Sequence, residues 1–331
     1  APMDSSMSTL QDFALTFLEV GALVFTGAIV LGLLAVIYMY VVDITQTKQA
    51  IRRNYPVIGR FRYVFEHLGE FFRQYFFALD REELPFNRAQ RSWVYRSAKN
   101  TDSTVAFGST HPLNQPGDFI FLNGLFPPLE EEIGGRSDIA FGEGYASQPY
   151  HTKSFFNISA MSYGALSAPA ITALSHGAKA AGIWLNTGEG AISPFHLEGG
   201  CDIIFQIGTA KYGVRDESGL LSDAKLRELA AHEQVRMFEI KLSQGAKPGK
   251  GGILPGTKVT EVIARTRGIP AGQDSLSPNR HPDIASIDDL LDMIVRVRQG
   301  TGKPTGFKAV IGQADWLDEL CQRIEARGLE Y

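Results

Sequence analysis

The stretch 235–256, VRMFEIKLSQGAKPGKGGILPG, carries the residue types best suited to chemistry. Residues 237–242 are predicted to form a short buried strand, which breaks into a loop rich in glycine and proline. Lys241 therefore lies at the carboxyl end of a strand, and Lys247 and Lys250 lie in the loop behind it. Because the loops at that end supply the active site of a (β/α) barrel, three positive charges are expected at one mouth.

Clustered lysines suit an anionic ligand, such as a carboxylate, a phosphate or the negative charge on a reduced flavin ring. A solvated basic loop is the alternative that the spacing alone leaves open. A nucleotide P-loop is excluded, because three residues instead of four separate Gly245 from the Gly249–Lys250 pair and Gly251 replaces the magnesium-binding Ser or Thr. The dinucleotide glycine pattern also fails, because Leu254 occupies its last glycine position.

Composition limits the other classes of partner. The 331 residues, 44% of them hydrophobic, allow one large domain with an appendage, and the net charge of −4 gives no indication of nucleic acid. Cys201 and Cys321 form no CxxC motif, and the seven histidines show no metal-ligand spacing. The sequence therefore predicts no protein-bound metal, no nucleic-acid partner and buried thiols in a reducing compartment.

A hydrophobic segment stands near the N-terminus. Residues 20–42 include 23 consecutive positions without a charge, enough to cross a bilayer core of about 30 Å as a helix. A cleaved signal peptide fits poorly, because Asp4, Asp12 and Glu19 precede the segment and the apolar run is too long. A buried core helix is the remaining alternative. We therefore predict a transmembrane anchor over residues 1–45.

Basic residues follow this segment closely, namely Lys48, Arg52, Arg53, Arg60 and Arg62. The positive-inside rule then places the N-terminus outside and the C-terminal domain in the cytoplasm, with a single membrane pass.

Residues 46–150 are predicted to form a juxtamembrane extension. Within it, residues 61–79 carry apolar side chains at helical spacing, so this helix either lies on the membrane surface or packs on the catalytic body. Residues 85–150 have many prolines and turn signals, and they are expected to be extended and irregular, with short strands around 119–122.

Strand and helix patterns alternate from residue 155 onward, which argues for a parallel α/β sheet or barrel. The expected strands are 155–161, the short stretch leading into NTGEG, 202–208, the strand before Lys241 and 306–311; the expected helices are 168–181, 222–231, 259–267, 287–299 and 316–326. Small, hydroxyl and amide residues follow several strands. They allow backbone groups to approach a flat ligand closely.

Five of these segments resemble the FMN-binding synthase domain of glutamate synthases: SAMSYGALS (159–167), NTGEG (186–190), EIKLSQGAKPGKGG (239–252), LPGTKVTEVIARTRG (254–268) and HPDIASIDDL (281–290). The chain is most similar to stand-alone bacterial proteins of this family that begin with a transmembrane segment. Several long motifs in one order are more specific than any single glycine pattern.

The resemblance implies a (β/α)8 TIM-type barrel, of which residues 151–331 form the N-terminal part. It implies FMN as cofactor and the reduction of 2-iminoglutarate, formed from 2-oxoglutarate and ammonia, to L-glutamate. Glu189 and Lys241 would be catalytic, and Lys247 and Arg267 would hold the carboxylates of 2-oxoglutarate. The flavin would be lined by the backbone around Ala160, Met161 and Ser162 and by the side chains of Thr187, Glu189, Gln206 and Lys241. Ordinary ion pairs at a barrel mouth are the alternative for each charged residue.

Departures from the family pattern leave two other hypotheses open. Ile253 stands where full-length synthases carry a substrate-contacting Gln, and Ala191 replaces a Gly, so an FMN enzyme acting on another keto or imino acid is one alternative. The chain reaches Tyr331 soon after the expected fourth or fifth strand, so a truncated, non-catalytic membrane scaffold is the other. An iron–sulfur cluster is expected only in a C-terminal part beyond this sequence. Ammonia would come from solution or a partner, and a protein is the possible electron donor.

Overall fold

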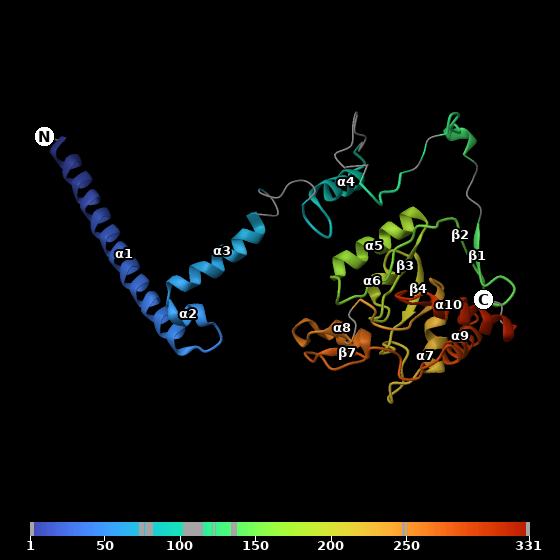
Figure 1. Cartoon of the computed structure of the whole chain (residues 1–331). Helices are drawn as coiled ribbons and strands as arrows, with labels where there is room; N and C mark the ends of the chain where they lie inside the picture. The colour runs from blue at the N-terminus through green and yellow to red at the C-terminus, as the bar shows by residue number, and fades with distance from the viewer. Residues whose placement is uncertain are drawn as a thin grey trace. The chain divides into compact units, whose positions relative to one another are not determined.

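The structure, a computed structural model, describes residues 3–72, 76, 82–101, 115–120, 122, 124–133, 138–246, 249 and 251–328. Its contacts divide the chain into two units, Ala1–Asn123 and Gly124–Tyr331 (Figure 1). Each unit is described by itself.

The first unit consists of helices. These are α1 (Met3–Thr45), α2 (Ala50–Asn54), α3 (Ile58–Phe72) and α4 (Arg88–Ala98). Residues Leu15–Thr45 of α1 are long and apolar enough to cross a membrane, and the most apolar part of this segment has no buried residue. The expected anchor is thus a helix that meets the requirements of length and composition, and spanning itself stays a prediction.

The two expectations for the extension have different outcomes. The amphipathic helix is present as α3 up to Phe72, and residues 73–75 and 77–79 lie outside the described residues. The expectation of an irregular segment over 85–150 is wrong at α4, which is a helix. At its start, Asn87 Oδ1 accepts from Gln90 N at 3.0 Å and Gln90 Oε1 accepts from Asn87 N at 2.9 Å. This reciprocal cap satisfies amides that a helix start leaves without partners. Phe119, Ile120 and Leu122 form no strand.

The second unit is a mixed α/β domain built on a four-stranded parallel sheet in the order β3-β4-β5-β8. The strands are β3 (Trp184–Asn186), β4 (Asp202–Ile207), β5 (Val235–Lys241) and β8 (Thr305–Lys308). The helices are α5 (Ala168–Ala181), the single turn α6 (Pro194–Leu197), α7 (Asp223–Ala230), α8 (Glu261–Arg267), α9 (Ile287–Thr301) and α10 (Asp315–Ala326). Among the described residues, this sheet does not close into a barrel.

Short antiparallel pairs and turns complete the unit. Strand β1 (Ile139–Phe141) pairs with β2 (Tyr150–Thr152), and β6 (Gly252–Leu254) pairs with β7 (Ser275–Ser277); two 3-10 turns cover Glu130–Glu132 and Gly256–Lys258. The strand expected at 155–161 is reduced to one parallel bridge, from Ile158 to Leu185. Its backbone still follows β3, because Ile158 N donates to Trp184 O and Asn186 N donates to Ile158 O, both at 3.0 Å.

The two faces of the parallel sheet differ in polarity, because successive side chains of a strand point to opposite sides. One face is apolar and packs with side chains of α7 and α9 in a single core, which includes Leu185, Ile203, Phe205, Ile207, Phe238, Ile240, Leu226, Leu229, Leu290 and Ile294. The other face carries Asn186, Gln206, Glu239 and Lys241 in neighbouring strands. The second face also carries Trp184, Ile204 and Met237, so its polar groups are concentrated toward the carboxyl ends of the strands.

Two adjacent leucines test where the core ends. Leu221 is buried in the core and Leu220 is 49% exposed. Leu221→Ala should lower the free energy of unfolding by about 2–5 kcal/mol because it leaves a cavity, whereas Leu220→Ala should lower it by less than about 1 kcal/mol. Urea denaturation of the detergent-solubilised chain, followed by tryptophan fluorescence, measures both. Equal losses would contradict the boundary of the core described above.

Candidate functional site

A cavity of about 520 Å³ lies at the carboxyl ends of β5 and β8. Ligands of parallel α/β folds bind at this end of the strands, where the connecting loops converge. The residues that line the cavity include Ser162, Ala165, Glu189, Lys241, Gln244, Ile253, Arg267, Ser275, Ser277 and Lys308. They come from segments far apart in the sequence, which the sheet and the β6–β7 pair bring together.

An ion pair and an amide form one side of this cavity. Lys241 Nζ lies 3.2 Å from Glu189 Oε2, and both side chains are about one-fifth exposed, at 19% and 23%. Gln244 holds the pair together, because its Nε2 donates to Glu189 Oε2 at 2.6 Å and its Oε1 accepts from Lys241 Nζ at 3.0 Å. The three side chains therefore form one connected polar group whose charges balance.

A glycine allows β4 to reach this group. A Cβ at Gly208 would lie 2.4 Å from Glu189 Cβ, which is closer than real contacts allow. The chain therefore needs glycine directly after β4 for Glu189 to take its place.

Arg267 supplies the second cation of the cavity, from the last turn of α8. Its Nη1 donates to Ser275 Oγ at 2.9 Å, its Nη2 donates to Tyr163 O at 3.1 Å, and its guanidinium lies 5.5 Å from the centre of the Tyr212 ring. Its Nε has no hydrogen-bond partner, and no ion pair joins it to a carboxylate in the described parts of the chain. Burial lowers the pKa of Arg267. Electrostatic interactions with Tyr212 and Glu189 offset only part of this effect, so an anionic ligand would stabilise the buried cation further.

A buried histidine fixes the backbone at Lys241. His281 is fully buried, and its Nε2 lies 2.9 Å from Lys241 O, a distance at which a neutral ring with hydrogen on Nε2 donates to the carbonyl. Burial, with a smaller contribution from the charge of Lys211, lowers the pKa of His281 to about 4. Lys211 is itself buried and paired with Asp283 at 2.7 Å.

Four of the residues expected from the sequence line this cavity, namely Ser162, Glu189, Lys241 and Arg267. Lys247 lies outside the described residues. Gln244, Ser275 and His281 had no role assigned from the sequence, although Gln244 and His281 lie within quoted motifs. Their roles in the site depend on hydrogen bonds to residues far away in the sequence, which a local motif does not predict.

The other expected residues lie elsewhere in the domain. Thr187 is buried, where its hydroxyl donates to Gly188 O and accepts from Gln206 N. Gln206 lies on the polar face of the sheet and donates to Glu239 Oε1 at 2.5 Å. Ala160 and Met161 are not among the cavity's lining residues; Met161 N donates to Asn186 O at 3.0 Å.

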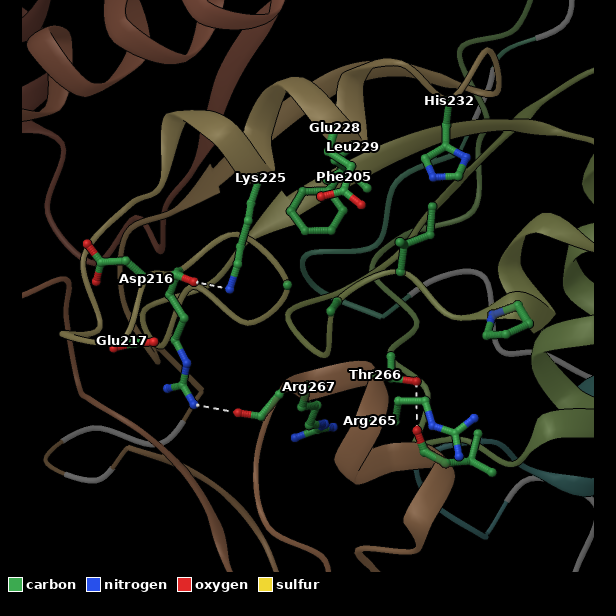
Figure 2. A pocket seen from close by; sticks show the side chains of 17 residues that line it. Phe205, Asp216, Glu217, Lys225, Glu228, Leu229, His232, Arg265, Thr266 and Arg267 are labelled. Carbon is green, nitrogen blue, oxygen red and sulfur yellow. Dashed lines mark hydrogen bonds between the residues drawn. The ribbon is translucent and has the colours of Figure 1, made fainter.

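A second cavity, of about 610 Å³, lies over the apolar face of the sheet at Phe205 and Leu229. Figure 2 shows charged side chains of both signs around it, including Lys225, Glu228 and Arg265. Lys225 Nζ donates to the backbone oxygen of Arg215 at 2.7 Å. Arg267 lines both cavities. The strand-end cavity at β5 and β8 is the better candidate, because it also contains the connected Glu189–Lys241 ion pair. Neither holds a metal cluster, since no group of three metal-ligating side chains occurs among the described residues.

Comparison with known proteins identifies the family. The family described as the conserved region in glutamate synthase matches residues 136–315, just over half of the chain. The chain belongs to the glutamate synthase family. All described residues of the strand-end cavity fall within the matched range. The resemblance to glutamate synthases drawn from the motifs is therefore confirmed at the level of the family, whereas FMN binding and the membrane anchor stay predictions.

Two relatives extend this assignment to glutamate synthase-like proteins. The chain is 35% identical over 340 residues to the glutamate synthase large subunit-like protein YerD of Bacillus subtilis, covering 91% of this chain and 64% of the relative. It is 37% identical over 209 residues to the archaeal-type glutamate synthase [NADPH] of Thermotoga neapolitana, covering 62% of this chain and 38% of the relative. The chain thus spans less than two thirds of either relative.

The buried histidine predicts a pH dependence of stability. The unfolded chain takes up a proton at His281 below a pKa of about 6.5, whereas the folded chain does so only below about 4. The free energy of unfolding should therefore fall as the pH drops from 6.5 to 4, by up to about 3 kcal/mol from this group. His281→Gln should reduce that slope, measured by urea denaturation at pH 7 and pH 5. His232→Gln, an exposed control, should not. Identical slopes in all three proteins would contradict the assignment.

Proposed function

We propose that this chain is an FMN-dependent, glutamate synthase-like oxidoreductase that converts 2-oxoglutarate and ammonia into L-glutamate through 2-iminoglutarate. The observation that carries the proposal is the strand-end cavity. The buried Arg267 lines this cavity together with the Glu189–Lys241 pair and forms no ion pair of its own among the described residues. A dicarboxylate supplies the missing charge. The proposal includes completion of the parallel sheet into a (β/α)8 barrel.

The cavity residues fit the ring of a flavin. Lys241 projects from the polar face of the sheet at a strand end and remains partly exposed, so it can donate to an anionic ring edge. Ser162 lines the same cavity and adds a hydroxyl. Among the described lining residues, no glycine-rich helix N-terminus offers a site for the phosphate, so only the ring is assigned here. Bound FMN would supply the hydride that reduces the imine carbon.

The remaining residues bind the substrate and move protons. Arg267 would hold one carboxylate of 2-oxoglutarate, and Lys247 the other. Glu189 would accept a proton from the attacking ammonia and later return one to the amine nitrogen. Gln244 keeps the Glu189 carboxylate in place through its 2.6 Å hydrogen bond, so that its free oxygen can face the substrate. Water leaves when the imine forms, and a partner protein would supply the electrons.

A second substrate class is favoured by one observation. Ile253 lines the cavity and is 54% exposed, at the position where the resemblance leads one to expect a substrate-contacting Gln. An apolar side chain there would suit another keto or imino acid. Turnover of 2-oxoglutarate with ammonia, compared with turnover of other 2-keto acids, separates the two substrates.

Membrane attachment is part of the proposal. Helix α1 would span the bilayer once, with the N-terminus outside and the C-terminal domain in the cytoplasm. Support comes from the length and composition of Leu15–Thr45 and from the basic residues that follow it.

The visible absorption spectrum of the purified chain tests the enzymatic proposal directly. Flavin bands that accompany the protein, together with glutamate formation, are expected. A protein without flavin, even when purified with added FMN, would instead favour the non-catalytic membrane scaffold.

Lys241→Met should weaken the binding of FMN by roughly 10- to 100-fold, because a charge-assisted hydrogen bond contributes about 1.5–3 kcal/mol. Lys225→Met removes an equal charge from the second cavity and should leave FMN binding unchanged. Fluorescence titration with FMN measures both affinities. Equal affinities in the two variants would contradict the role of Lys241.

Arg267→Lys should raise the KM for 2-oxoglutarate at least about tenfold, because lysine cannot donate in the planar, paired manner of a guanidinium. The matched control is Arg265→Lys, because Arg265 is an exposed residue of the same helix. The KM of this variant for 2-oxoglutarate should stay unchanged. The urea midpoint of each variant separates a binding defect from unfolding. A normal KM for folded Arg267→Lys would remove Arg267 from the substrate site.

A further inference from the structure

The corner between α1 and α3 is built around one buried carboxylate, Asp43, which is fully inaccessible to solvent. Arg52 donates to it from Nε at 2.9 Å and from Nη2 at 2.6 Å. Arg60 does so from Nε at 2.9 Å and from Nη2 at 2.8 Å. One acidic side chain thus joins the last turns of α1 to both α2 and α3.

The backbone at the corner is fitted to this carboxylate. Val57 has a φ of 66°, a conformation that β-branched residues rarely adopt, and its N–H donates to Asp43 Oδ2 at 3.0 Å. Gly59 allows α3 to meet α2, because a Cβ there would lie 3.0 Å from Ile51 O. The direction in which α3 leaves α1 is therefore fixed by side chains and backbone together (Figure 1).

Helix α3 carries an uncovered apolar face. Phe61, Val64, Phe65 and Leu68 follow one another at helical spacing and are 57%, 52%, 67% and 40% exposed. The polar side of the helix carries the Arg62–Glu66 pair at 2.9 Å. In water, an apolar face of this size requires a cover.

We propose that α3 lies flat in the interface of the bilayer, with this apolar face among the acyl chains and the Asp43 corner at the headgroups. The inference rests on the proposed membrane pass of α1. Helix α3 begins shortly after α1 ends, so the corner places it at the membrane surface if α1 spans.

Charge complementarity favours lipid over protein as the cover. Asp43 neutralises only one of the two arginines that it binds, and Lys48 and Arg53 add further positive charge at the corner. Anionic headgroups attract such a cluster next to an amphipathic helix. The partner is therefore an anionic lipid surface, in the leaflet where α1 ends.

Site-specific quenching tests this placement in the full chain. Single cysteines replace Leu68 on the apolar face, Glu66 on the polar face and Ala28 within α1, in a Cys321→Ser background; the remaining Cys201 is buried. An environment-sensitive dye reports each position in vesicles of phosphatidylcholine and phosphatidylglycerol. Spin-labelled lipid should quench the dye at position 68 several-fold more than at 66, and aqueous iodide should show the reverse order.

Each other outcome has a defined meaning. Shielding of the dye at position 68 from both quenchers would show that protein covers the apolar face. Iodide quenching at position 68 as strong as that at position 66 would show that water surrounds the helix. Either result overturns the inference. If the dye at position 28 is quenched by lipid while the dye at 68 is quenched by neither lipid nor iodide, α1 still spans the bilayer although α3 does not lie in the interface. If lipid does not quench the dye at 28, α1 does not span the bilayer.

The corner has its own test. Asp43→Asn leaves Arg52 and Arg60 without a charged acceptor, so lipid quenching of the dye at position 68 should fall at least twofold. Glu66→Gln, which removes one exposed carboxylate of α3, should leave it unchanged. Unchanged quenching in Asp43→Asn would show that the carboxylate does not orient the helix.

Discussion

The alternation of side chains along the parallel strands is the constraint on which the α/β unit depends. Since successive residues face opposite sides, β4 and β5 can bury Phe205, Ile207, Phe238 and Ile240 against the helices only by sending Gln206, Glu239 and Lys241 to the other face. A shift of register by one residue would exchange the two sets. The core therefore determines where the cavity lysine emerges, and stability and chemistry share one register.

Buried cations of the second unit include Lys211, Lys303 and Arg267, and their partners differ. Lys211 is paired with Asp283, and Lys303 donates to the backbone oxygens of Ala230, His232 and Val235. Arg267, like Lys303, has neutral hydrogen-bond partners, namely a hydroxyl and one carbonyl, but it differs from both lysines in that it lines the strand-end cavity. These neutral groups hold the guanidinium in place, and the charge of nearby Glu189 offsets only part of the cost of its burial. Under the proposed function, Arg267 would be completed by a carboxylate of the substrate, in the cavity that also contains the Glu189–Gln244–Lys241 group.

Periodicity in the sequence predicted elements whose signals are local. Helix α5 covers the predicted 168–181, and α9 and β5 differ from their predicted bounds only at the ends. The errors arise where distant contacts decide. The segment 155–161 is apolar, yet it pairs with β3 only at Ile158, and the β6–β7 pair joins residues 252–254 to 275–277. Of the site, the motifs indicated Glu189, Lys241 and Arg267, whereas Gln244 and His281 gain their roles from partners 55 and 40 residues away.

The balance between charged and apolar lining bears on substrate choice. A site that hydrogen-bonds a substrate group rejects analogues without that group by about 10⁴–10⁵, whereas an apolar contact discriminates by only about 10–200-fold. Ile253 can give discrimination of the second kind only, because its side chain has no donor or acceptor. Under the proposed function, recognition would then rest on Arg267, which would bind a carboxylate, and on the Glu189–Gln244–Lys241 group, which would lie at the reacting carbon. Because these features are common to many 2-keto acids, the proposed enzyme would select for the α-keto carboxylate more strictly than for the remainder of the substrate.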